Sequence, residues 1–332
     1  MTAGPHGPGR GPPVADILAG DRRALAAAIT LIESTREEDR EPAEDLLQAL
    51  LPHAGKAVRL GISGAPGVGK STFIEAFGTR AIAAGRRLAV LAIDPSSERS
   101  GGSILGDKTR MPELARSEKS FIRATPASGT LGGVARRTRD AMIACEAAGF
   151  DLVMVETVGV GQSEAAVADM TDLYMLLVQP GAGDELQGIK RGVMERADIV
   201  VVTKADGALE GPAAHAKADF EAALSLHAGE GPWTPCVIAC SSLDGTGLDE
   251  IADAVERHRT AMAKAGSLEA RRAAQAGAWL WREVEDSLVA ALHADERLAP
   301  AVAALEAEVA AQTLPPSAAA RRIVRRLLER DA

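Results

Sequence analysis

The segment that most constrains the fold of this chain is the glycine-rich stretch Gly64-Ala-Pro-Gly-Val-Gly-Lys-Ser71. It has the pattern G-x-x-x-x-G-K-[ST], in which backbone N–H groups surround a phosphate, the lysine reaches the β- and γ-phosphates and the serine hydroxyl binds Mg²⁺. An apolar, β-branched run at 57–63 precedes the loop, and helical spacing follows it. Because strand, loop and helix in this order are the context that such a motif needs, we expect a nucleoside triphosphate site. The residues expected to bind phosphate are Gly64, Ala65, Pro66, Gly67, Val68, Gly69, Lys70, Ser71 and Thr72.

Strand-like and helix-like segments alternate from residue 57 to residue 264. The expected strands are 57–63, 87–94, 120–124, 150–157, 172–179, 198–204 and 235–241, and the expected helices are 70–84, 133–148, 185–196, 212–227 and 248–264. Runs such as 88–93 and 199–202 are apolar almost throughout, which is typical of strands covered on both faces. We therefore predict an α/β domain over 57–264, with a mostly parallel sheet flanked by helices and ligands at the carboxyl ends of its strands.

The segments outside this domain differ in composition. Residues 1–13 are rich in glycine and proline and lack the pattern of a secretion signal, so we expect a disordered lead-in. Residues 14–56 form an expected helical extension, and 265–332 contain no strand signal. The apolar positions that mark helix faces are Leu18, Leu25, Ile29 and Ile32; Leu46, Leu47, Leu50 and Leu51; Leu280, Val284, Leu288 and Leu292; Leu298, Val302, Leu305 and Val309; and Ile323, Val324, Leu327 and Leu328.

The amphipathic C-terminal helices allow two interpretations from the residues alone. They either pack back on the nucleotide domain or form an arm that dimerises, with Trp279 and Trp281 as candidate anchors.

Composition excludes several classes of partner. Lys and Arg total 37 against 46 Asp and Glu, a formal charge of −9 that argues against a broad nucleic-acid or anionic-membrane surface. No apolar run approaches the ~20 residues that span a bilayer. Three cysteines, Cys145, Cys236 and Cys240, make no disulfide framework, so a reducing cytoplasm fits best. Cys236 and Cys240 share a strand face, but a metal site needs further ligands, which favours ordinary core cysteines.

Two acidic residues are candidates for the metal. Asp94 ends an expected buried strand, where its carboxylate either contributes to Mg²⁺ binding or caps the turn before Pro95. Asp107 lies in the polar, glycine-rich segment 96–110, a candidate switch beside the triphosphate. It is the carboxylate there best suited to Mg²⁺, and the alternative is a solvated loop acid.

Glu156 ends the expected strand 150–157, where phosphate-loop enzymes carry their second acidic residue. It can contact Mg²⁺ or its water, or orient the attacking water. Gly159 would let the backbone approach the γ-phosphate. Val160 cannot orient water as a glutamine does, and Gln162 lies nearby in the sequence, so we expect slow intrinsic hydrolysis that a partner or a switch movement completes.

The stretch Thr203-Lys204-Ala205-Asp206 resembles the guanine-selecting pattern N-K-x-D, with threonine in place of asparagine. Asp206 would accept hydrogen bonds from the guanine N1–H and exocyclic amine, a donor pair that adenine lacks, while the Lys204 stem covers the base. The residues Ser241, Ser242 and Leu243 follow the last expected strand and resemble the accompanying base-contacting loop.

Six stretches together closely resemble the MeaB/ArgK family of GTPases, phosphate-loop NTPases of the SIMIBI class that act as chaperones of methylmalonyl-CoA mutase. They are 64–71, 94–97, 101–111, 128–133, 156–164 and 180–190. The resemblance runs from about residue 14 into the C-terminal helices and is densest from 58 to 206. Departures are Thr203 and an alanine-rich arm beyond residue 295.

The resemblance implies a homodimeric GTPase that binds GTP or GDP with Mg²⁺ and docks on an adenosylcobalamin-dependent acyl-CoA mutase. It would gate cofactor delivery and protect or reactivate that enzyme, with the C-terminal arm forming the dimer. The residues carried over are Lys70, Asp107 and Glu156 as the catalytic set, Ser71, Asp94, Asp107 and Glu156 around the metal, Lys204 and Asp206 at the base, and Gln187 and Lys190 coupling nucleotide state to the mutase.

Two other activities remain as alternatives at this point. Related proteins serve as metal-insertion GTPases, although clusters of Cys and His ligands are missing from this sequence. A small-molecule or protein kinase would need an acceptor pocket and a base for the acceptor hydroxyl, and no motif supplies either.

Overall fold

The computed structural model describes residues 11–94, 110–126, 131–157, 163–181, 191–225 and 231–328. The chain divides into two compact units, Met1–Gln275 and Ala276–Ala332.

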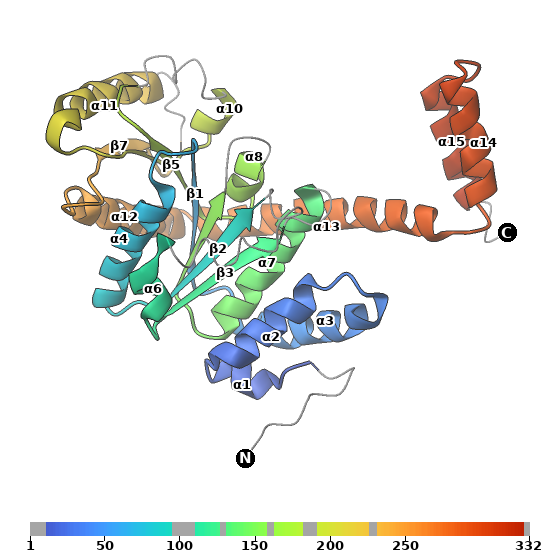
Figure 1. The fold of residues 1–332 in the computed structure, drawn as a ribbon, viewed down its shortest axis with the longest axis horizontal. Coiled ribbons are helices and arrows are strands. Elements are labelled where there is room, and N and C mark those ends of the chain that lie inside the picture. The colour runs from blue at the N-terminus through green and yellow to red at the C-terminus, as the bar shows by residue number, and fades with distance from the viewer. Residues whose placement is uncertain are drawn as a thin grey trace. The chain divides into compact units, whose positions relative to one another are not determined.

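The first unit is built on a seven-stranded sheet in the order β3-β2-β4-β1-β5-β6-β7, with every described pair of neighbours parallel (Figure 1). The strands are β1 Val58–Gly64, β2 Leu88–Asp94, β3 Ser120–Pro126, β4 Leu152–Thr157, β5 Leu173–Val178, β6 Ile199–Val202 and β7 Cys236–Ala239. The predicted strands and the predicted α/β fold class are therefore confirmed.

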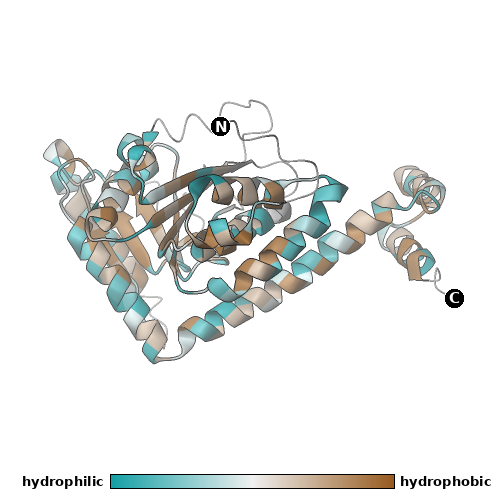
Figure 2. Ribbon diagram, turned by 90° about the horizontal axis from the view of Figure 1, so that it is seen from below, coloured by the Kyte–Doolittle hydropathy of each residue, from teal (hydrophilic) through white to brown (hydrophobic). Residues whose placement is uncertain are grey.

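The strands are apolar because they are covered on both faces. Every residue of β4, β5 and β6 is buried. Figure 2 shows the same contrast, with predominantly hydrophobic strands and helices that mix hydrophobic and hydrophilic residues. Leu60, Ile62, Met154 and Met175 are among the fully buried residues of the central core.

Helices connect the strands, as parallel pairing requires. They are α4 Lys70–Ala83, α6 Pro112–Arg116, α7 Leu131–Ala147, α8 Ser163–Ala168, α10 Arg191–Met194, α11 Glu210–Ser225 and α12 Leu248–Lys264. The predicted helices 70–84, 133–148, 212–227 and 248–264 correspond to α4, α7, α11 and α12. The predicted helix 185–196 is described only from residue 191, where α10 begins, and α6 was not predicted.

Three helices form the N-terminal extension, α1 Val14–Leu18, α2 Arg22–Glu33 and α3 Glu37–Leu50. Leu25 and Ile29 of α2 and Leu50 of α3 are fully buried, and both helices pack against α7. Leu51, predicted on the apolar face, is 58% exposed because α3 ends at Leu50 and the chain continues as a short 3₁₀ turn, Leu51–His53. That prediction was wrong.

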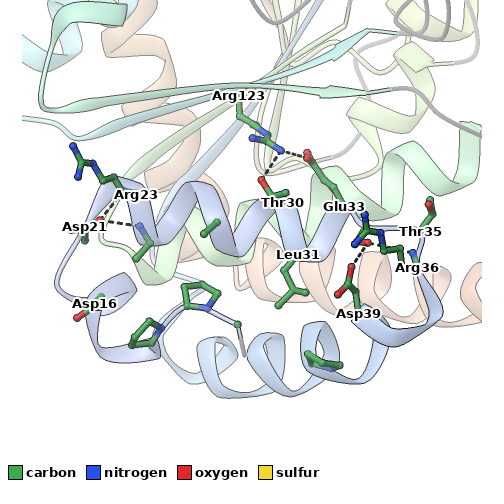
Figure 3. A pocket seen from close by; sticks show the side chains of 17 residues that line it. Asp16, Asp21, Arg23, Thr30, Leu31, Glu33, Thr35, Arg36, Asp39 and Arg123 are labelled. Atoms are coloured by element: carbon green, nitrogen blue, oxygen red, sulfur yellow. Dashed lines mark hydrogen bonds and ion pairs between the residues drawn. The ribbon is translucent and has the colours of Figure 1, made fainter. Parts of the chain in front are cut away.

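Arg123 of β3 ties the extension to the sheet. Its guanidinium pairs with the carboxylate of Glu33 and lies 3.3 Å from the Thr30 hydroxyl oxygen (Figure 3). A cavity of about 880 Å³ adjoins these residues and is lined by side chains of both charges, including Arg23, Asp39 and Arg123.

The second unit contains the greater part of α13 Ser267–Ala294, followed by α14 Ala299–Ala310 and α15 Pro316–Leu328. Leu305, Leu314 and Ala319 form a small core between α14 and α15. The three predicted C-terminal helices are thus present. None of the described helices is long and apolar enough to cross a membrane.

Candidate nucleotide site

The phosphate loop joins β1 to α4 at the carboxyl end of the central strand of the sheet. Gly69, the residue before α4, has φ 102°, a conformation that L side chains rarely adopt. A β-carbon on Gly64 would lie 2.5 Å from the Leu177 carbonyl oxygen, so the loop starts in direct contact with β5. Both glycines are therefore required by this backbone path.

Lys70 begins α4 and is buried, with its ammonium folded back onto the loop. The Lys70 Nζ donates to the carbonyl oxygens of Gly64 at 2.8 Å and Ala65 at 3.2 Å. Burial lowers the pKa of this ammonium, while the negative charges of Glu156 and Glu164 act in the opposite direction. The lysine is thus a desolvated cation held by neutral groups.

Ser71 and Glu156 come together from α4 and β4. The Ser71 Oγ lies 3.5 Å from the Glu156 Oε1, and Glu156 is only 3% exposed. The pairing of Ile62 with Glu156 in the β1–β4 register places this carboxylate beside the start of the loop. A hydroxyl and a carboxylate are both hard oxygen ligands, so this pair fits Mg²⁺.

Thr203 holds the phosphate loop from the end of β6. Its buried hydroxyl lies 2.7 Å from the Val68 carbonyl oxygen and 3.1 Å from that of Val178. A single hydroxyl proton can be donated to one of these acceptors at a time. The threonine that departs from the N-K-x-D pattern therefore contacts the loop rather than pointing away from it.

Lys204 also reaches the phosphate loop. It adopts the left-handed region with φ 55°, and its Nζ donates to the Gly67 carbonyl oxygen at 2.8 Å and to the Gln179 Oε1 at 3.1 Å. A non-glycine residue at positive φ is uncommon and persists where its surroundings hold it. Here the two hydrogen bonds of its side chain do so.

Asp206 is anchored by the loop after β7. Its Oδ2 accepts a hydrogen bond of 2.6 Å from the Ser241 Oγ, and the backbone N–H of Ala205 donates to the Cys240 carbonyl at 3.1 Å. Ser241 is fully buried, Ser242 is half-buried and Leu243 is 82% exposed. The two stretches expected around a base thus lie side by side.

Five predicted site residues lie outside the described residues: Asp107, Gly159, Gln162, Gln187 and Lys190. The backbone of Asp94 ends β2, and the neighbouring pair Ile93–Thr157 places that end at the same edge of the sheet as Glu156. Its side chain is not among those described.

Three further residues meet at the end of β1, where the loop begins, and were given no role there from the sequence: Ser63, Thr157 and Glu164. Thr157 Oγ1 donates to Ser63 Oγ at 3.1 Å, which in turn donates to Glu164 Oε1 at 3.3 Å. Glu164 opens α8, where an acid is ordinarily explained by the helix dipole. No local pattern therefore separated it from a simple helix-start residue.

The Cys240 side chain belongs to the apolar core, and its backbone carbonyl contacts the site. Burial raises the pKa of the Cys240 thiol to about 12 and also raises that of Cys236. Within the described ranges, no group of three or more His, Cys, Asp or Glu side chains is placed to hold a metal ion.

Comparisons with known proteins identify the family of this chain. The family model described as "Methylmalonyl Co-A mutase-associated GTPase MeaB" matches residues 25–297. A "Putative GTPase" of Caulobacter vibrioides is 52% identical over 93% of this chain and 94% of its own length. "GTPase ArgK" of Escherichia coli is 48% identical, covering 83% of this chain and 84% of the relative.

Two further relatives extend the comparison. The "Methylmalonic aciduria type A homolog, mitochondrial" of Mus musculus is 45% identical over 92% of this chain and 76% of the relative. A solved structure described as "LAO/AO transport system kinase" has a TM-score of 0.75 at 37% identity, covering 95% of this chain and 96% of that one. Since the family model spans most of the sequence, the chain belongs to the MeaB family of methylmalonyl-CoA mutase-associated GTPases.

Proposed function

We propose that this chain binds GTP with Mg²⁺ and hydrolyses it to GDP and phosphate. The observation that carries the proposal is the meeting, at one edge of the sheet, of Lys70, the Ser71–Glu156 pair and the anchored Asp206. These are the groups that phosphate, metal and guanine respectively require.

Each residue has a separate role in this mechanism. Lys70 leaves its two carbonyl acceptors and donates to the β- and γ-phosphate oxygens, where it stabilises the charge that develops as the γ-phosphoryl departs. Ser71 and Glu156, with Asp94 and Asp107, would hold Mg²⁺. Mg²⁺ bound there would supply positive charge that neutralises the phosphates.

Selection of guanine rests on Asp206. Its carboxylate is oriented by the Ser241 hydroxyl, which leaves the remaining lone pairs for the guanine N1–H and exocyclic amine. The stem of Lys204 covers the base while its ammonium stays on the loop. Ser242 and Leu243 complete the wall beside the base.

The intrinsic rate of hydrolysis is slow in this proposal, and a partner raises it. The supporting observation is Val160, a side chain that cannot orient water, in a stretch that otherwise carries Gly159 and Gln162. The partner is an adenosylcobalamin-dependent acyl-CoA mutase, whose cofactor delivery the protein gates and which it protects or reactivates. Family membership supports this assignment, and Gln187 and Lys190 are the proposed coupling residues.

The protein acts as a homodimer through its C-terminal arm, and the cytoplasm is its proposed location. Four large apolar side chains of α13 are exposed, Leu280, Trp281, Leu288 and Val289. Trp281 and Leu288 are seven residues apart and lie on the same side of the helix, with Leu280 and Val289 flanking them on either side, so the exposed apolar surface is broad enough to pair with a second helix.

The dimer is tested by removing residues 276–332, because Arg272 and Gln275 at the start of α13 belong to the first unit and hydrogen-bond within it. The truncated protein is expected to be a monomer in light scattering that binds GTP with unchanged affinity. A truncated dimer, or a monomeric full-length chain, contradicts the arm.

The whole proposal is tested by GTP hydrolysis with and without a purified adenosylcobalamin-dependent mutase from the same source. Stimulation by the mutase supports both the activity and the partner. Clean GTP hydrolysis without stimulation retains the GTPase and rejects the partner. Transfer of labelled γ-phosphate to another substrate in place of water would identify a kinase instead.

A further inference from the structure

Glu164 lies buried beside Ser63, the residue that precedes the phosphate loop, and is linked to a chain of two hydroxyl groups. It is 6% exposed, and its Oε1 accepts from the Ser63 Oγ, which accepts in turn from the Thr157 Oγ1. Ser63 and Thr157 are fully buried. A carboxylate removed from water costs free energy unless hydrogen bonds and opposite charge compensate it. Here a hydroxyl supplies the hydrogen bond, and the Lys70 ammonium lies within its electrostatic influence.

The two hydroxyl residues occupy particular places in the chain. Ser63 immediately precedes Gly64, whose carbonyl accepts from Lys70, and Thr157 immediately follows Glu156, which contacts Ser71. The chain of hydrogen bonds from Thr157 through Ser63 to Glu164 therefore links the backbone beside the phosphate-binding lysine to the backbone beside the metal-binding carboxylate.

Gly61 of β1 fixes the helix that carries Glu164. A β-carbon at Gly61 would lie 2.7 Å from both the Val167 Cγ1 and the Thr171 Oγ1, so α8 packs directly on the strand. Glu164 lies three residues before the fully buried Val167 and thus on the same side of α8. The helix has no room to approach further, and its carboxylate is held towards β1.

We propose that Glu164 is a positioning residue for GTP hydrolysis, which acts through Ser63 to keep the phosphate loop in register with Glu156. This inference rests on the proposed GTPase function and assigns Glu164 no contact with substrate. Loss of the contact lets the loop and β4 shift relative to each other, and small displacements of groups that stabilise a transition state lower the rate steeply.

The experiment compares steady-state GTP hydrolysis of the full-length chain and its variants, with folding checked by circular dichroism and thermal unfolding. Glu164→Ala and Ser63→Ala are each expected to lower kcat by about tenfold or more, with little change in KM. The double variant is expected to be no slower than the slower single variant, because both changes break the same contact. Losses of kcat that add fully in the double variant overturn the proposal that Glu164 acts through Ser63.

Glu164→Gln separates the need for a hydrogen-bond acceptor at this position from a need for the negative charge. Its side chain has the same length, and its amide oxygen accepts from the Ser63 hydroxyl, so kcat is expected to recover towards that of the unaltered chain. A glutamine variant as slow as the alanine variant overturns the proposal.

Glu146→Gln is the matched control, since Glu146 is 5% exposed and pairs with Arg59 away from the phosphate loop. It is expected to lower the melting temperature and leave kcat unchanged. If the unaltered chain hydrolyses GTP and Glu164→Ala does so at the same rate, the inference alone fails. If the unaltered chain does not hydrolyse GTP, the proposed function itself fails.

Discussion

Buried charges are held in different ways at the amino ends and at the carboxyl ends of the strands of the parallel sheet. At the amino ends of the strands, buried acids pair with arginines: Glu146 Oε1 lies 2.5 Å from Arg59 Nε, and Asp172 accepts from Arg272 at 2.6 and 2.7 Å. At the carboxyl ends, Lys70 donates to backbone carbonyls and Glu156 contacts a hydroxyl.

The pairs at the amino ends hold elements together. Arg272 also donates to the carbonyl oxygens of Gly55 and Ala57, and Asp172 accepts from the backbone N–H of Arg59, so α13, β1 and β5 meet at one network. Removing one member of such a buried pair leaves an uncompensated charge, which is strongly destabilising.

In the proposed function, the charges at the carboxyl ends serve a ligand instead. A buried ammonium whose hydrogen-bond partners are neutral carbonyls can exchange them for phosphate oxygens, whereas an arginine already paired with a carboxylate has no comparable gain. Partner type therefore distinguishes buried charges that stabilise the fold from those available for chemistry.

Lys70→Ala tests the charges at the carboxyl ends of the strands and should have the largest effect. We expect GTP turnover to fall by about a thousandfold, since charge stabilisation of the γ-phosphoryl group is lost. The melting temperature should change much less than turnover, because the cost of burying the ammonium is removed while Glu156 and Glu164 lose a nearby positive charge. Turnover and thermal unfolding measured on the same preparation check this, and near-normal turnover would contradict the assigned role.

Asp172→Asn tests the buried pairs at the amino ends of the strands. It leaves the Arg272 guanidinium without its carboxylate, and we expect a loss of about 3 kcal/mol in the free energy of unfolding. Urea denaturation measures this loss, and the affinity for GTP, determined by calorimetry at low temperature, should not change. A large fall in GTP affinity in the folded variant would contradict the distinction between the two ends of the strands.

Asp206→Asn tests base selection at the carboxyl ends of the strands. The amide presents N–H groups where the carboxylate accepted hydrogen bonds, so GTP should bind about 10- to 100-fold more weakly. Xanthosine triphosphate, whose base has a carbonyl in place of the exocyclic amine, should lose less affinity or gain it. Competition binding with both nucleotides provides the measurement. Unchanged discrimination between them would place base recognition elsewhere.

Thr203→Val should have the smallest effect. The change keeps the shape of the side chain and removes the hydroxyl that contacts the Val68 carbonyl, so GTP should bind about fivefold more weakly. Thr203→Ser keeps the hydroxyl and is the control, expected to bind as tightly as the unaltered chain. Equal affinity of the valine variant would show that the hydroxyl does not support the phosphate loop.

The sequence predicted the strands and the phosphate loop because both are local patterns. Continuous apolar runs are sufficient to place β2 and β6, and the loop motif is complete within eight residues. The five-residue α6 is too short to show a helical period, and Leu51 fitted that period although the helix ends one residue earlier.

The contacts that organise the site could not be predicted in the same way. The Thr203–Val68 contact joins residues 135 apart, and the Ser63–Glu164 contact joins residues 101 apart. Such pairs depend on which strands become neighbours, and β1 pairs with β4 and β5 rather than with the next strand in the chain. No sequence motif around either residue of such a pair indicates the order of the strands in the sheet.

In the proposed GTP site, the contacts from Thr203 and Lys204 to the phosphate loop would give rise to a chelate effect. They join the half proposed for the base to the half proposed for the phosphates by hydrogen bonds within the protein, so the spacing of the two halves is set before the nucleotide arrives. A ligand whose base and phosphates are covalently linked then binds its second half at a high effective concentration. Guanosine and tripolyphosphate supplied as separate molecules forfeit that advantage, however well each half fits.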